Sequence, residues 1–188
     1  MIKSLRNIVL IPYLLLLFSS LAAVKPTIAR EVNTAYFTKA PRLLGASTTY
    51  SGVRVRYAKY YFNVEIPKDA GNHLQQIVIA QRQGQEEIEF RLDETVAYLG
   101  TNRNKEEQIA IAEVIQNEET GEIKVILENP IPPDTTFTVA LKPRRNPFFD
   151  GVYLFGVTVF PQGDDPTGLY LGAGRLQFYR GNDGFIRN

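Results

Sequence analysis

The chain has 188 residues, with 21 basic and 20 acidic side chains, a single histidine and no cysteine. The absence of cysteine excludes disulfides and thiol catalysis, and one histidine gives little support to a zinc site or a histidine-based triad. Because the formal net charge is only +1, the chain also lacks the basic surplus on which binding to nucleic acid depends.

The amino-terminal segment has the order of a secretory signal peptide. Lys3 and Arg6 precede an apolar stretch over residues 8–24, and small side chains follow it. We therefore predict a signal peptide over residues 1–29 and a single exported domain over residues 30–188. A retained membrane anchor is the alternative, because the apolar stretch is close to the shortest length that spans a bilayer. Removal of the segment would leave 18 basic and 20 acidic residues, a net charge of −2.

The first part of this domain predicts short strands after an irregular start. Residues 30–40 show no regular period and predict a loose lead-in. A strand is predicted over Tyr60–Ile66, ended by Pro67, and another over Leu74–Gln81, which is apolar on both faces like a central strand. Glu87–Leu92 alternates between charged and apolar residues, which is typical of a strand with one face in water.

The middle of the chain is less regular. Asp93–Asn104 predicts a short helical turn followed by an exposed loop. Ile109–Gln116 and Glu122–Leu127 predict a hairpin closed at Gly121, where glycine can take a positive φ. Asn129–Asp134 contains three prolines and predicts an unpaired crossover between sheets or edges.

Three more strands are predicted, over Thr135–Leu141, Gly151–Phe160 and Arg175–Tyr179. Gly172–Gly174 precedes the last of them. It does not predict a phosphate-binding loop, which needs a strand before it and a helix after it. The glycines indicate instead that another backbone segment approaches closely. About eight short strands with no helical periodicity predict an all-β fold, an immunoglobulin-like antiparallel two-sheet sandwich. A jelly-roll and a closed barrel are left open.

No pattern in the sequence predicts catalysis. His73 lies in a turn and is interpreted as a solvated residue. Adjacent carboxylates occur five times, but neighbours on a strand point to opposite faces and so form poor catalytic pairs. Asp164 and Asp165 are the best candidates for calcium ligands, yet they lack the spacing of a known calcium loop. We predict no catalytic residue, no metal site and no cofactor.

Two segments combine aromatic and basic residues. The Tyr57–Phe62 run is interpreted as strand and core. Arg144, Arg145, Phe148 and Phe149 surround an Asn-Pro pair, and neighbouring aromatic residues in such a loop are difficult to bury together. Because loops on a rigid sandwich often carry function, these four residues are the predicted ligand-binding site.

Short motifs along nearly the whole domain carry a family resemblance through their order and spacing. They are Pro41-Arg42-Leu43, Thr48-Thr49, Tyr60-Tyr61-Phe62, Pro67–Gly71, Leu74-Gln75-Gln76, Gln81, Phe90, Thr95, Ala97, Gly100, Asn146-Pro147, Gly151–Val157, Pro161-Gln162-Gly163, Leu171-Gly172 and Gly174–Tyr179. Together they resemble the exported, mainly cyanobacterial proteins of the domain of unknown function 2808 family. Asn72-His73 departs from the Glu-Pro pair that the family pattern has at this place.

The resemblance implies export to the periplasm, the cell surface or the thylakoid lumen, and it implies no activity and no catalytic residue. Our first hypothesis is a non-enzymatic envelope module that binds an unknown envelope protein or polysaccharide. A nucleic acid is not an expected partner, and a membrane is one only if the leader is retained. The alternatives are a carbohydrate- or calcium-binding module and a hydrolase that uses two carboxylates brought together by the fold.

Overall fold

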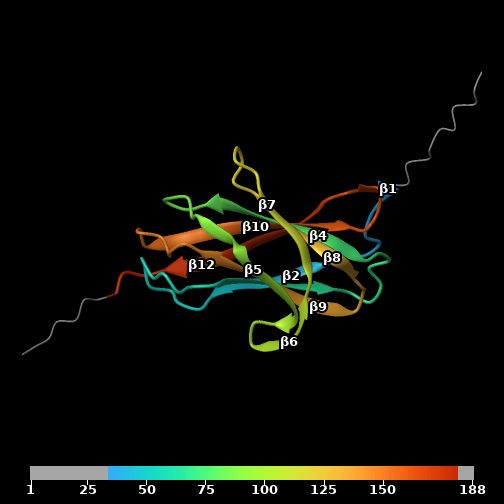
Figure 1. Ribbon diagram of the computed structural model, residues 1–188, viewed down its shortest axis with the longest axis horizontal. Coiled ribbons are helices and arrows are strands. Elements are labelled where there is room, and N and C mark those ends of the chain that lie inside the picture. Colours follow the sequence, from blue (N-terminus) through green and yellow to red (C-terminus); the bar gives the residue numbers. More distant parts are fainter. Residues whose placement is uncertain (1–33, 182–188) are drawn as a thin grey trace, which may run out of the picture. The chain divides into compact units, whose positions relative to one another are not determined.

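The alternating segments pair into two facing five-stranded antiparallel sheets in the computed structural model, which describes residues 34–181 (Figure 1). The predicted signal peptide lies outside the described residues. Within residues 34–181 no helix has the length and apolar character needed to cross a membrane. These residues lie within one compact unit.

The β4 sheet has the strand order β12-β10-β4-β8-β7, and the β3 sheet has the order β2-β3-β9-β5-β6. The strands of the β4 sheet are β4 (Leu74–Gln83), β7 (Ile111–Gln116), β8 (Ile123–Ile131), β10 (Gly151–Pro161) and β12 (Leu169–Phe178). Those of the β3 sheet are β2 (Arg42–Thr48), β3 (Tyr60–Ile66), β5 (Phe90–Thr101), β6 (Asn104–Ile109) and β9 (Thr135–Pro143). A short parallel pair joins β1 (Thr34–Ala35) to β11 (Asp165–Pro166). Part of the predicted lead-in is therefore a strand.

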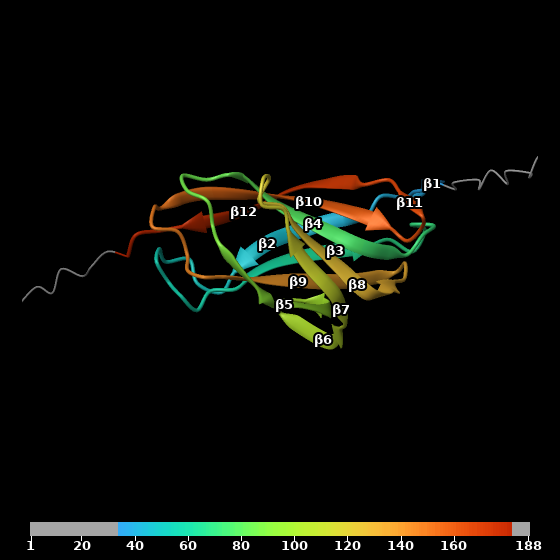
Figure 2. The ribbon, with the colours of Figure 1, turned by 45° about the horizontal axis from the view of Figure 1, so that its top comes forward.

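The predicted antiparallel two-sheet sandwich of the immunoglobulin-like class is confirmed, with twelve strands rather than about eight. The two layers are clearest in Figure 2. Sequence patterns missed β2 and β6 because neither buries a full row of apolar side chains. All but one residue of β6 are exposed, and β2 is only half-buried.

The core lies between the sheets and contains the inward-facing alternate residues of their strands. Phe155 of β10 is at its centre, with its ring centroid 5.8 Å from that of Phe62, 5.9 Å from Tyr60 and 6.2 Å from Phe90. Such edge-to-face contacts add to the free energy gained by burying apolar surface. Because no cysteine is present, this packing must stabilise the domain without disulfides.

Two segments differ from their predictions. Asp93–Asn104 is mostly strand, because Ala97 reaches the core of the sandwich while Tyr98 covers the outer face of the β3 sheet. The strand predicted over Glu87–Leu92 begins only at Phe90. The predicted alternation between exposed and buried side chains along residues 87–92 is nevertheless present. Glu87 to Glu89 instead form an extended loop segment.

The proline-rich segment that follows β8 also differs. The prediction that Asn129–Asp134 does not pair is wrong, because β8 continues to Ile131, which lies opposite Leu74. The register of β4 and β8 shifts beside this pair, and such an irregularity accommodates residues that cannot donate to the ladder. The chain does cross to the other sheet here, since β9 belongs to the β3 sheet.

Gly172–Gly174 lies inside β12 rather than before the last strand, so that prediction is also wrong in position. The predicted close backbone approach is present at Gly174. A Cβ atom there would lie 2.5 Å from the Cβ atom of Ala46 in β2. This contact joins the edge of one sheet to the edge of the other.

We expect Gly174→Ala to lower the free energy of unfolding by about 2 kcal/mol, because the added methyl group would force the two edges apart. Urea denaturation of the purified protein measures the change. The Ala46→Gly, Gly174→Ala double variant restores the space and should be more stable than Gly174→Ala alone. A double variant with no recovery would show that this contact is not the cause.

Candidate functional site

Three loops and the residues after β12 meet at one end of the sandwich, which we call the loop end. The loops are residues 49–59, 84–89 and 144–150, and the carboxyl-terminal residues are 179–181. Main-chain hydrogen bonds join them: the Val53 amide donates to the Tyr179 carbonyl at 3.0 Å, and the Arg54 amide donates to the Pro147 carbonyl at 2.9 Å. The loop end is therefore a connected surface rather than separate loops.

Asn146 holds the loop end together from inside and is completely buried. Its Nδ2 donates to the carbonyls of Tyr50 at 2.8 Å and Gly52 at 2.7 Å, and its Oδ1 accepts from the Tyr60 hydroxyl at 3.0 Å. Its own amide donates to the Val55 carbonyl at 2.7 Å. One side chain thus ties two loops to the core.

Two buried tyrosines complete this support. Burial raises the pKa of the Tyr60 hydroxyl well above its ordinary value, with smaller contributions from Tyr153 and Glu86. Burial also raises the pKa of Tyr153, whose hydroxyl donates to the Phe149 carbonyl at 3.2 Å. Both hydroxyls therefore stay protonated and act as donors beneath the loop.

The Glu86 carboxylate shapes the outer part of the loop. It accepts hydrogen bonds from the amides of Phe148 and Phe149, the second at 3.0 Å. Beside it, Glu89 forms an ion pair with Arg144 at 3.3 Å, and the Arg144 amide donates to the Glu89 carbonyl at 2.8 Å. These contacts fix the segment that carries the predicted aromatic residues.

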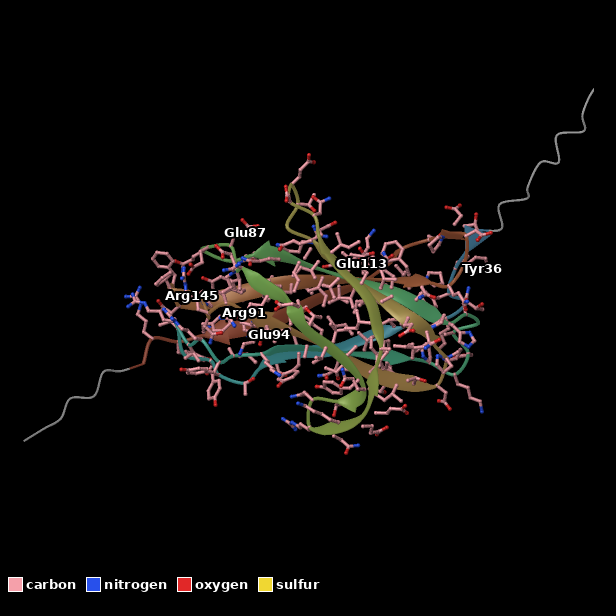
Figure 3. The ribbon with its side chains drawn as sticks, in the orientation of Figure 1. Tyr36, Glu87, Arg91, Glu94, Glu113 and Arg145 are labelled. Carbon is pink, nitrogen blue, oxygen red and sulfur yellow. The ribbon has the colours of Figure 1, made fainter. Side chains whose placement is uncertain are left out.

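Of the four predicted binding residues, Arg145 and Phe148 contact each other, whereas Arg144 forms an ion pair elsewhere. The Arg145 guanidinium carbon is 4.0 Å from the centroid of the Phe148 ring, and that of Arg54 is 5.4 Å from the same ring. Phe149 is 46% exposed. Arg144, in contrast, is engaged by Glu89. Figure 3 shows Arg145 at the loop end and Tyr36 at the opposite end of the sandwich.

Three further exposed tyrosines lie on the loop end. Tyr57 is 77% exposed, which corrects its interpretation as a core residue, although the rest of the run from Ala58 to Phe62 is buried or half-buried. Tyr50 and Tyr179 were missed, because only the fold brings these distant positions together. We call the following set the aromatic–arginine surface: Tyr50, Arg54, Arg56, Tyr57, Arg145, Phe148, Phe149 and Tyr179.

The two acidic residues predicted as calcium candidates lie at and next to β11, at the end of the sandwich opposite the loop end (Figure 2). The Asp165 carboxylate lies at β11 and accepts a hydrogen bond from the Thr34 hydroxyl at 3.4 Å. Among residues 34–181 no group of three or more His, Cys, Asp or Glu side chains is placed to hold a metal ion. Calcium binding by Asp164 and Asp165 remains untested. His73 is exposed in its turn, as its interpretation as a solvated residue requires.

The fold and the loop end define a cysteine-free antiparallel β-sandwich that presents exposed aromatic residues on connected loops. The chain belongs to the family described as protein of unknown function DUF2808, whose pattern matches residues 34–178. The resemblance drawn from the short motifs is thereby confirmed. No protein with a curated description matches the chain.

Solved structures with a similar arrangement are remote in sequence. The collagen-binding domain of a Staphylococcus aureus adhesin is 8% identical with a TM-score of 0.39, covering 72% of this chain and 96% of its own. The collagen-binding subdomain of the Enterococcus faecalis surface protein ACE is 12% identical with a TM-score of 0.37, covering 78% and 99%. A cohesin module from a Clostridium perfringens family 33 glycoside hydrolase is 14% identical with a TM-score of 0.33, covering 74% and 98%. At this level of likeness, what those proteins bind gives no information about this chain.

Proposed function

We propose that the protein is an exported, non-enzymatic binding module of the cell envelope and that the aromatic–arginine surface binds a protein partner. One observation carries the proposal: five exposed aromatic side chains and three arginines share one end of a rigid sandwich. Tyrosine and arginine are enriched among the residues that dominate protein interfaces. The buried support from Asn146 reduces the cost of ordering these loops on binding.

The charges of this surface indicate the kind of partner. Arg54, Arg56 and Arg145 form no ion pair with any residue between 34 and 181. Unpaired guanidinium groups beside aromatic rings favour a partner surface that presents carboxylates around an apolar centre. The partner is therefore an acidic protein surface.

Two surface carboxylates have pKa values shifted away from the range that a general acid needs. A general acid needs a carboxyl group whose pKa is raised, so that it is protonated near neutral pH. The hydrogen bond from Lys39 instead lowers the pKa of Asp69, and the hydrogen bond from Arg91 lowers the pKa of Glu94. Both groups are exposed and behave as ordinary surface ion pairs.

A polysaccharide is the second candidate partner, favoured by the exposure of Tyr57. Tyr57 is 77% exposed, and an exposed tyrosine ring offers a flat apolar face on which a sugar can stack. This candidate predicts binding that depends on the tyrosine rings rather than on the arginine charges.

The test is affinity capture from an envelope extract with the purified full chain. We expect capture of a defined protein, reduced at least about tenfold by the Arg54→Glu, Arg145→Glu double variant, because both charges are reversed at the contact. The Arg103→Glu, Lys124→Glu double variant makes the same change in net charge away from the loop end and should capture normally.

Equal melting temperatures of the variants would show that folding is unaffected. Capture that is the same with both double variants would contradict the proposal. Retention of a glycan that is lost in Tyr57→Ala, with no protein retained, would favour the polysaccharide.

A further inference from the structure

The two sheets separate at the side of the sandwich formed by β5 and β7. Only Ala110 separates β6 from β7, yet these strands belong to different sheets. Ile109 therefore pairs with Ala97 of β5, whereas Ile111 pairs with Leu127 of β8. Figures 1 and 2 show that β5 and β7 diverge with distance from the turn that joins β5 to β6. We call the region between residues 87–95 and β7 the wedge.

The backbone along both walls of the wedge lacks a strand partner. In β5, Arg91 pairs with Lys142 and Val96 with Ala140, so that Leu92–Thr95 pairs with no strand among the described residues. On the other wall, β7 is the edge strand of its sheet and pairs only with β8 within residues 34–181. Unpaired strand edges are the usual sites at which an extended peptide adds to a sheet.

The wedge contains hollows along its length. Near the point where the strands diverge, a hollow of about 300 Å³ is lined by Leu92, Asp93, Thr95 and residues 111–114. Toward the loop end, hollows of about 260 and 390 Å³ share Glu87, Ile88, Phe90 and Gln116. Ile88 and Phe90, which are both buried, line both of these hollows.

Thr95 is a buried polar residue that lines the hollow of about 300 Å³. The residue is only 9% exposed, and its hydroxyl has no hydrogen-bond partner among the described residues. A buried polar group without a partner is costly, so native proteins rarely retain one without a reason. Because the oxygen itself is covered, a ligand in the hollow supplies the partner once the Thr95 side chain rotates toward it.

The side chains along the wedge are acidic. Glu87, Asp93 and Glu113 form no ion pair with any residue between 34 and 181. The arginines nearby are already engaged, Arg91 by Glu94 at 2.8 Å and Arg144 by Glu89 at 3.3 Å. In Figure 3, Glu113 lies on β7, across from the labelled Glu94 and Arg91 on β5. The wedge therefore has uncompensated negative charge.

We infer that the wedge binds an extended peptide in which lysine or arginine alternates with apolar residues. The backbone of the peptide pairs with β7, its apolar side chains cover Ile88 and Phe90, and its cations face Glu87, Asp93 and Glu113. The peptide enters from the loop end, because β5 and β7 converge at Ile111, two residues after the Ile109 that pairs with Ala97, and some of their Cα atoms lie within 8 Å of each other. A strand inserted between two others needs about 9.6 Å, twice the usual strand spacing. This site is separate from the aromatic–arginine surface.

The test uses the purified full chain and a fluorescent octapeptide that alternates lysine and valine, followed by fluorescence anisotropy. We expect saturable binding, with additional protection from hydrogen exchange in the complex at the Gln116 end of β7, which faces the hollows toward the loop end. The same peptide with every backbone amide methylated should bind at least about tenfold more weakly, because neither of its edges can donate to the β7 ladder. A peptide that alternates glutamate and valine should not bind.

Matched variants locate the site. Glu113→Lys should weaken binding about tenfold, and Glu118→Lys, the same charge change at the tip of the β7–β8 hairpin, should leave it within about twofold. Thr95→Val should raise the melting temperature, because it removes an unsatisfied hydroxyl, and should weaken binding of the peptide. The Arg54→Glu, Arg145→Glu variant should bind the peptide normally, so failure of this inference and failure of the proposed function are distinguishable.

Three results would overturn the inference. The first is equal binding of the methylated and unmethylated peptides, or protection that falls outside β7. The second is a dimer in sedimentation velocity that Glu113→Lys dissociates, which would assign the wedge to a second copy of the chain. The third is a cationic amino-sugar polymer that protects β7 while the peptide does not bind.

Discussion

Replacing Asn146 with alanine is expected to lower the free energy of unfolding by about 3 kcal/mol and to release the loop end. The change leaves the buried Tyr60 hydroxyl and the carbonyls of Tyr50 and Gly52 without their hydrogen-bond partner. Unsatisfied buried groups cost about 1–3 kcal/mol each, and water entering the space would recover part of that cost. Urea denaturation measures the stability, and hydrogen exchange over residues 49–59 measures the order of the loop.

Tyr60→Phe is the matched control, because it removes only one of the three hydrogen bonds. We expect it to cost about 1 kcal/mol while the loop stays ordered. The double variant should cost less than the sum of the two single changes, since both remove the same Tyr60–Asn146 contact. Additive effects, or loops that remain protected in Asn146→Ala, would show that Asn146 does not organise the loop end.

Phe155→Ala is expected to lower the free energy of unfolding by about 4 kcal/mol. Phe155 is 1% exposed and its ring contacts those of Tyr60, Phe62 and Phe90, so the truncation opens a cavity in the middle of the core. Single domains are stable by about 5–15 kcal/mol, and this one has no disulfide to limit the loss. Thermal and urea denaturation would measure it directly.

Phe155→Leu fills most of the same volume and should cost about 1–2 kcal/mol. The difference between the two variants isolates the cavity from the lost ring contacts. A loss for Phe155→Ala no larger than that for Phe155→Leu would show that the surrounding strands close over the space and that the core does not depend on this ring.

Much of the fold could be predicted because burial imposes a period on the sequence. Tyr60–Ile66 is a strand with the predicted bounds, and Gly121 has the positive φ expected at its hairpin. Asp93–Asn104 was misassigned because the pairing of β5 shifts in register between Arg91 and Val96, which interrupts the simple alternation. Local patterns do not record such shifts, since they depend on the partner strand.

The candidate site was predicted only in part, for a similar reason. Phe148 and Phe149 stood out because adjacent aromatic residues in a proline-containing loop are difficult to bury. Tyr50 and Tyr179 carried no local signal, and Arg144 could not be distinguished from Arg145 until its ion pair with Glu89 was seen. Exposure of a loop residue depends on what the other loops cover.

By itself, the sequence determined the all-β class, the absence of disulfides and the family pattern, because composition and the period of two along a strand are local properties. Only the tertiary structure decided which residues share a surface. The strand order brings Tyr50, Tyr57, Phe148 and Tyr179 to one end, and the change of sheet at Ala110 opens the wedge. Both features arise from pairing between segments far apart in the chain, which no local pattern specifies.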